Sequence, residues 1–164
     1  MSATTEQPPV YGACMTFDAG TVFPAGTKFA EGCTFGRGCH FGPGCNFGNS
    51  CRFDWLCEFG AACRFGLYCR WQEHCIFGPG CKFSGFSGFG PRCKFRKDCH
   101  FEDSQHFGWD CTFGPRCLFD GGAHFAWGCK FGPECVADGF VTVGVEMTEA
   151  TRPKNLGSWE RVRT

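Results

Sequence analysis

Sixteen cysteines are the residues of this chain with the greatest capacity for chemistry, and 15 of them obey one spacing. From Cys33 to Cys135 they recur every six residues or at a multiple of six, as C-x5-C. Structural zinc sites and iron–sulfur clusters favour closer pairs such as C-x2-C, so we predict no metal and no cofactor here. Disulfides belong to oxidising compartments, whereas reduced cysteine packs as a small apolar residue. The spacing therefore predicts buried, reduced thiols.

A second group of candidate residues shares one interval, which is three times the cysteine spacing. His124 follows His106 by 18, Trp127 follows Trp109 by 18, and Gln105 precedes the first histidine. Imidazoles can ligate metals or transfer protons, and tryptophans are enriched where proteins bind each other. If the chain coils with this same period, each pair lies on neighbouring turns. We predict a partner-binding site formed by Gln105, His106, Trp109, His124 and Trp127.

A third group is basic and shares the same interval. It consists of Lys28, Arg64, Lys82 and His100, with Asn46 between the first two. Neighbouring like charges repel, so phosphate or an acidic partner surface is a candidate counterpart, and we predict an anion-binding ladder. The alternative is that each base reaches a nearby carboxylate, which favours solubility and contributes little energy.

The elements that must position these residues come from one six-residue unit, which fills residues 15–140 with 21 consecutive copies. Its consensus is C-x-F-G-x-G, as in residues 33–38, and the third position is Phe or Trp in 20 of the 21 copies. Alternate side chains of an extended segment share a face, so the Cys and the aromatic residue point inward together. The glycines suit a bend. Because a unit this short buries its apolar side only against neighbouring units, the repeat predicts a solenoid.

Written from the aromatic residue, the unit F-G-x-x-C-x resembles the hexapeptide repeat of the left-handed parallel β-helix family, with Phe where that family usually has Leu, Ile or Val. The resemblance implies three hexads per triangular coil, a left-handed coil and a homotrimer. Most Gly-Pro corners agree with this period, since Gly42, Gly78, Gly114 and Gly132 differ by multiples of 18, with Gly90 as the one exception. We therefore predict an all-β, single-domain triangular β-solenoid of about seven coils.

The solenoid is predicted to occupy residues 15–140, between an N-terminal lead and cap at 1–14 and a C-terminal strand or cap and tail at 141–164. One inward ladder loses its cysteines after Cys69 and continues with Ser87, Gln105 and Ala123. One explanation is a change of packing, in which Phe86 fills a neighbouring gap and Gln105 bonds to local backbone. The other is a ligand or partner site around Gln105, which requires its inward amide to be satisfied.

Two enzymatic branches of the resembling superfamily set the alternatives to a binding role. Its acyltransferases carry a catalytic histidine with an inserted loop or extra domain, and the repeat here has no insertion. The γ-class carbonic anhydrases hold zinc with three histidines across a trimer interface, but their H-x4-H spacing is absent here. We therefore expect a non-enzymatic, rigid protein–protein interaction surface, such as a viral or bacterial inhibitor or an assembly element. A trimeric enzyme, either an acyltransferase or a zinc lyase, is the alternative.

Composition bounds the remaining classes. Lys+Arg and Asp+Glu balance at 16 each, so no overall field favours nucleic acid or membranes. A nucleic-acid-binding or DNA-enzyme-inhibiting solenoid is a further alternative, similar to pentapeptide-repeat rods that mimic DNA, although basic faces have the wrong sign for mimicry. No apolar stretch approaches the roughly 18 residues of a membrane span, and the polar start lacks the features of a signal peptide. We expect a cytoplasmic protein with a protein partner.

Overall fold

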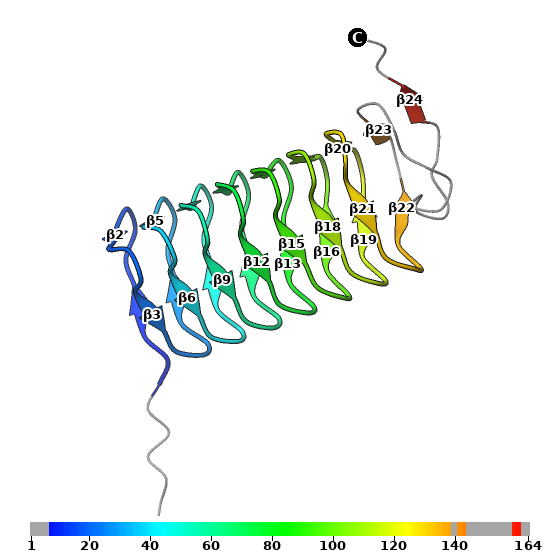
Figure 1. Ribbon diagram of the computed structural model, residues 1–164. Helices are drawn as coiled ribbons and strands as arrows, with labels where there is room; N and C mark the ends of the chain where they lie inside the picture. Colours follow the sequence, from blue (N-terminus) through cyan, green and yellow to red (C-terminus); the bar gives the residue numbers. More distant parts are fainter. Residues whose placement is uncertain (1–6, 139–140, 144–158, 162–164) are drawn as a thin grey trace, which may run out of the picture.

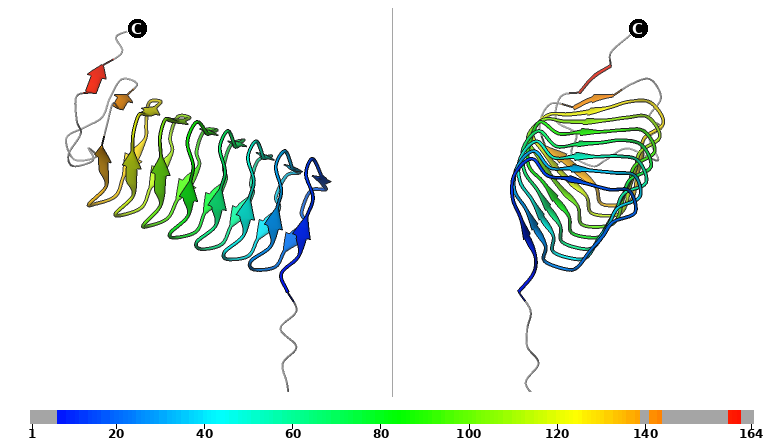
Figure 2. Two further views of the ribbon diagram at one scale, coloured as in Figure 1. Left: turned by 180° about the vertical axis from the view of Figure 1, so that it is seen from behind. Right: turned by 90° about the vertical axis from the view of Figure 1, so that its left-hand side faces the viewer.

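The computed structural model describes residues 7–138, 141–143 and 159–161, and its chain winds into a straight rod (Figure 1). Three parallel β-sheets run along the rod, one on each of its three sides (Figure 2). From β1 to β23, consecutive strands of the chain belong to different sheets, so neighbouring strands within a sheet come from successive coils. The predicted all-β, three-sided solenoid of about seven coils is therefore confirmed.

The strands are short, and most begin one residue after an inward Cys or its substitute. Sheet A holds β1 (Val10–Tyr11), β4 (Lys28–Phe29), β7 (Asn46–Phe47), β10 (Arg64–Phe65), β13 (Lys82–Phe83), β16 (His100–Glu102), β19 (Leu118–Asp120) and β22 (Val136–Asp138). Sheet B holds β2 (Thr16–Phe17), β5 (Thr34–Phe35), β8 (Arg52–Phe53), β11 (Arg70–Trp71), β14 (Gly88–Phe89), β17 (Gln105–Phe107), β20 (Ala123–Phe125), β23 (Val141–Val143) and β24 (Trp159–Arg161). Sheet C holds β3 (Val22–Phe23), β6 (His40–Phe41), β9 (Glu58–Phe59), β12 (Ile76–Phe77), β15 (Lys94–Phe95), β18 (Thr112–Phe113) and β21 (Lys130–Phe131).

The register of all three sheets follows the predicted period of three hexads. Arg64 pairs with Lys82 in sheet A, and Arg70 pairs with Gly88 in sheet B. In sheet C, Ile76 pairs with Lys94. Equivalent residues of successive coils therefore lie side by side on one face, so a sequence interval of 18 identifies neighbours on the surface.

The core consists of aromatic rings stacked along each sheet. Phe35 and Phe53, which are neighbours in sheet B, lie with ring centroids 4.8 Å apart and an interplanar angle of 4°. Rings from different sheets meet edge to face, as Phe35 and Phe41 do at 86°. Offset stacks and edge-to-face contacts are both favourable for aromatic rings, so the same ring satisfies both geometries at once. This repeated packing explains why the third hexad position is aromatic almost throughout.

The cysteines fill the inner corners between these rings as free thiols. From Cys33 onward all are buried, and all 16 cysteines are unpaired. Each buried thiol donates to the backbone carbonyl 21 residues earlier, as when Cys39 Sγ lies 3.3 Å from the Asp18 oxygen. Burial raises the pKa of the Cys39 thiol above 9.0, because a thiolate is disfavoured away from water. The prediction of stacked, unpaired thiols is confirmed. The structure adds that each buried thiol makes a weak hydrogen bond to the previous coil.

The corners between sheets use a left-handed residue at the sixth position of most hexads. Gly44 takes this conformation at φ 70°, but so does Ala62 at φ 57°. The glycine that follows the aromatic residue has a different reason to be there, because coils approach most closely at this point. A Cβ at Gly60 would lie 2.5 Å from the Pro43 nitrogen. That contact is too short for any side chain, so the stacking of the coils at Gly60 requires glycine there.

The corner between sheets A and B changes shape in the later coils, after the inward ladder of sheet B has lost its cysteines. At Tyr68 and Phe86 the left-handed residue is the sixth of the hexad, whereas in the two following coils it is the fifth, Asp103 and Gly121. The strands β16 and β17, which flank the first of these altered corners, each extend to three residues. The bends before the inward residues Gln105 and Ala123 thus lie one residue earlier in the hexad than those of the preceding coils.

The two ends of the rod extend the predicted repeat. Strand β1 lies within the segment assigned to the N-terminal lead and cap, yet it pairs with β4 as a regular member of sheet A. At the other end β23 pairs with β20, and β24 then pairs with β23. Residues 144–147 of the alternating C-terminal segment and residues 162–164 of the tail lie outside the described residues.

Candidate functional site

Gln105 lies inside the rod and takes the place of a cysteine. Its side chain is fully buried, and Nε2 donates to the Ser84 carbonyl at 3.0 Å and to the Glu102 carbonyl at 2.6 Å. Ser84 belongs to the previous coil, at the same offset as the acceptors of the thiols, so the amide uses the same kind of carbonyl. This side chain cannot contact a partner on the surface, and its exclusion corrects the predicted site. The alternative prediction, that Gln105 bonds to local backbone, is confirmed.

His106 and His124 form a stacked pair on the outer face of sheet B. They are register partners on β17 and β20, with ring centroids 4.5 Å apart and planes within 7°. Partial burial, and then the neighbouring His106, lower the pKa of His124 below 6.5. His124 therefore favours the neutral state, in which an imidazole offers one N–H donor and one acceptor nitrogen.

Trp109 and Trp127 lie beside the histidines, at the corner between sheets B and C. Their rings stack at 5.5 Å with an interplanar angle of 4°, and Trp127 is 56% exposed. The guanidinium of Arg92 covers the ring of Trp109 at 4.1 Å, so a cation–π contact extends the stack by one coil. Trp55 occupies the same corner three coils earlier and contacts Arg37 instead. The structure thus brings together four of the five predicted partner-binding residues.

A second exposed aromatic pair lies across the same face, at the corner between sheets A and B. Tyr68 and Phe86 stack at 5.6 Å, and they are 56% and 53% exposed. The expectation that Phe86 fills an internal gap is therefore wrong, because its left-handed corner position directs it outward. The signal for this pair was present in the sequence, since both residues occupy the sixth hexad position and differ by 18.

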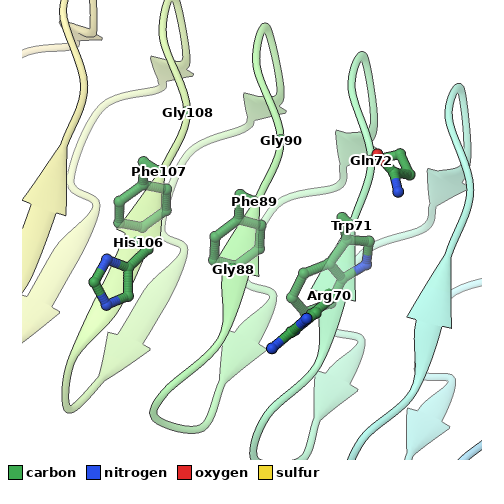
Figure 3. A pocket seen from close by; sticks show the side chains of 9 residues that line it. All are labelled: Arg70, Trp71, Gln72, Gly88, Phe89, Gly90, His106, Phe107 and Gly108. Carbon is green, nitrogen blue, oxygen red and sulfur yellow. The ribbon is translucent and has the colours of Figure 1, made fainter.

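Between the two aromatic pairs the face of sheet B is hollowed at Gly88. A shallow, open depression of about 420 Å³ lies over β14, with Arg70 and His106 among its lining residues. In Figure 3 these two side chains stand on either side of the strand that carries Gly88. We call the face formed by the outward residues of β11, β14, β17 and β20, together with its two bordering aromatic pairs, the B face.

The predicted anion-binding ladder lies on sheet A, away from the B face. Lys28, Asn46, Arg64, Lys82 and His100 are successive register partners on this sheet. His100 Nε2 lies 2.6 Å from Asp120 Oδ2, so its imidazole already has an acidic partner. Arg64 and Lys82 have no acid within 4.0 Å among the described residues.

The alternative prediction is that basic side chains on the faces pair with carboxylates at the corners. Few of the described residues form such pairs. Within residues 7–138, one ion pair contains an arginine or a lysine. It joins Arg116 to Asp98, and both of these are corner residues. Its Nε–Oδ1 distance is 2.7 Å, and Arg116 lowers the pKa of the Asp98 carboxyl. The outward arginines and lysines therefore remain available to an external acid.

The described residues contain no group of three or more His, Cys, Asp or Glu side chains placed to hold a metal ion. Within the same residues no helix is long and apolar enough to cross a lipid bilayer. The B face has donors, a cation and exposed rings around a shallow depression, which suits binding to an extended ligand.

Comparison of the chain with models of protein families, with curated proteins and with solved structures gave no match.

Proposed function

We propose that the protein is a non-enzymatic, rigid scaffold whose B face binds a protein partner. The observation that carries this proposal is the presence of two stacked aromatic pairs, Tyr68–Phe86 and Trp109–Trp127, at opposite borders of one face. Three of the four rings are exposed, and Trp109 is half-buried. Exposed aromatic residues that gather on one surface are typical of protein interfaces, where Trp, Tyr and Arg supply much of the binding energy.

Rigidity supports the same role. Each exposed ring is already held by a neighbouring ring, so little side-chain freedom remains to be lost when a partner binds. The backbone beneath is bonded to the coils on either side. The Gly108 N–H donates to the Phe89 carbonyl of the preceding coil, and the Ala126 N–H of the following coil donates to the Phe107 carbonyl. A preorganised surface of this kind suits a cytoplasmic viral or bacterial inhibitor or an assembly element, which must present one fixed shape.

Affinity capture from an extract of the native host tests the proposal. The wild-type rod is compared with the double variant Trp109→Ala/Trp127→Ala, which removes one aromatic pair without touching the core. Trp55→Ala is the matched control, because it removes a tryptophan from the same corner three coils away. We expect wild type and control to recover the same proteins and the double variant to lose them. Equal recovery by all three proteins would refute the B face as the binding surface.

We also propose that the chain is a distant Phe- and Cys-rich relative of the left-handed hexapeptide-repeat family and forms a homotrimer. The support is the coil of three hexads with three parallel sheets, which is the coil that the resemblance implies. A crystal structure gives the hand of the coil, and light scattering gives the mass in solution. A right-handed coil would contradict the family assignment, and a monomer would contradict the trimer.

A further inference from the structure

Gly88 stands out because no structural constraint requires glycine there. Among the outward strand positions of the described sheets it is the one without a side chain. A Cβ built on Gly88 meets nothing within 4 Å, and its backbone is outside the left-handed region. Gly90, two residues later, is the opposite case, since its Cβ would lie 2.6 Å from the Gln72 carbonyl carbon. The missing side chain at Gly88 therefore leaves space on the surface, which is a reason to look for a ligand.

The space is bounded by two residues that can donate hydrogen bonds to an anion. Arg70 and His106 are the register partners of Gly88 on its two sides, so their backbones lie two rungs apart, about 9.6 Å. The guanidinium presents a planar fork that suits a carboxylate, and the imidazole has an N–H to offer from the other side. We call this feature the Gly88 notch, meaning the depression over β14 between Arg70 and His106 (Figure 3).

The charge around the notch is uncompensated within the face. The outward positions of sheet B carry Arg52, Arg70, His106 and His124 but no acid, in strands β2 to β20 as the structure describes them. Arg70 has no carboxylate within 4.0 Å among the described residues. An acidic group from outside would therefore meet a cation that no internal partner neutralises, and it would lie on a surface of complementary sign.

The aromatic residues set the direction of the ligand. The rung that contains Gly88 runs from Phe86 at one corner to Arg92 at the other, where Arg92 lies on Trp109. An extended segment of about five residues spans such a rung at about 3.3 Å per residue. Its central side chain would enter the notch, while side chains nearer its ends would reach Phe86 on one side and Trp109 on the other.

We infer that the Gly88 notch receives the side-chain carboxylate of an extended, acidic segment of the partner protein, between Arg70 and His106. Apolar residues on either side of that acid pack on the two exposed aromatic pairs. This inference rests on the proposed function, because it names the chemistry of the partner that the B face binds.

The test uses a phage-displayed library of random heptapeptides selected on the intact wild-type protein. We expect enrichment of Asp or Glu at one position, with aromatic or aliphatic residues on both sides. A selected peptide is then synthesised with its acid or with Gln at that position, and the dissociation constants are measured by calorimetry. The Gln peptide should bind at least tenfold more weakly.

Three variants locate the binding site of the selected peptide. Gly88→Thr fills the notch with the residue that the same ladder carries at Thr16 and Thr34, and Arg70→Met removes the guanidinium. Both should weaken binding of the acidic peptide at least tenfold without lowering the thermal midpoint, which Gly88→Thr can raise because threonine favours a strand more than glycine does. Arg64→Met is the matched control, because it removes an arginine from the same hexad position on sheet A, and it should bind as wild type does.

Three outcomes would overturn the inference: selection without an enriched acid, unchanged binding by Gly88→Thr, or tighter binding of single-stranded oligothymidine than of the acidic peptide. The host-extract capture separates this failure from failure of the proposed function. If Trp109→Ala/Trp127→Ala loses the captured proteins while Gly88→Thr keeps them, the B face binds a partner without using the notch.

Discussion

Phe65 lies near the middle of the rod and is the best residue for testing how much the aromatic core contributes to stability. Its ring is 3% exposed and stacks between Phe47 and Phe83, with centroid distances of 4.8 and 4.9 Å. It also meets Phe59 and Trp71 edge to face. Phe65→Ala therefore interrupts one ring column and removes contacts to both other sheets.

The expected loss follows from these contacts. Burying a phenylalanine contributes about 1.5–3 kcal/mol, and favourable ring pairs add about 0.5–1.5 kcal/mol each, although such terms are not additive. The stacked coils above and below resist collapse into the cavity, so we expect a loss of about 3–5 kcal/mol in the free energy of unfolding. Urea denaturation followed by circular dichroism measures it, provided that the transition remains a single cooperative step.

Arg64→Ala is the matched control, because Arg64 precedes Phe65 on the same strand but points outward. Substitutions at such exposed positions usually change stability by less than about 0.5 kcal/mol. A loss below about 1 kcal/mol for Phe65→Ala would refute the reasoning, since removal of a ring buried among six others should cost more than this. Equal losses for the two variants would show that the strand, and not the ring, determines stability.

Three further predictions concern other parts of the rod. Only Cys14 is exposed among the 16 cysteines, so a thiol reagent should modify one thiol in the folded protein and all of them after unfolding; rapid modification of several thiols in the folded state would contradict the buried ladders. The pKa of His124 is lowered by burial and by His106, so the unfolded chain binds a proton first as pH falls below about 6.5, and the free energy of unfolding decreases. His124→Thr should therefore flatten the dependence of the free energy of unfolding on pH between about pH 7 and pH 5, as measured by urea denaturation. An unchanged dependence would contradict a lowered pKa for His124. The buried Nε1 of Trp71 has no hydrogen-bond partner among the described residues, and leaving such a donor unsatisfied costs about 1–3 kcal/mol of stability. Trp71→Phe removes this donor and should keep or raise the free energy of unfolding. A clear loss in urea denaturation would show that packing of the larger ring dominates.

Much of the fold could be predicted from the sequence because the hexad is a physical unit. An inward Cys and an inward Phe, separated by one outward residue, leave a single arrangement that buries both. The interval between Arg64 and Lys82 was enough to place them on neighbouring rungs. The burial of the cysteines also followed from their spacing. The hydrogen bond from each thiol to a carbonyl 21 residues earlier did not, because it depends on the offset between adjacent coils.

The candidate site could be predicted only in part, because local corner geometry decides which side chains are exposed. The stacked pairs His106–His124 and Trp109–Trp127 followed from their interval of 18. Gln105 was assigned to the surface site although its inward position buries it. The outward direction of Phe86 results from its left-handed backbone, a conformation that the aromatic residue itself does not signal, so only its interval of 18 from Tyr68 pointed to the pair.

The central claim is that a partner binds the B face and neither of the other two. Photo-crosslinking tests it directly, with benzoylphenylalanine placed in turn at three equivalent outward positions of one coil. Leu118 lies on sheet A, His124 on sheet B and Lys130 on sheet C. None of them lines the Gly88 notch, so each substituted rod keeps that feature intact. In native host extract we predict crosslinked partner from position 124 and none from positions 118 or 130. Crosslinks from either of these two positions, with none from 124, would contradict the account.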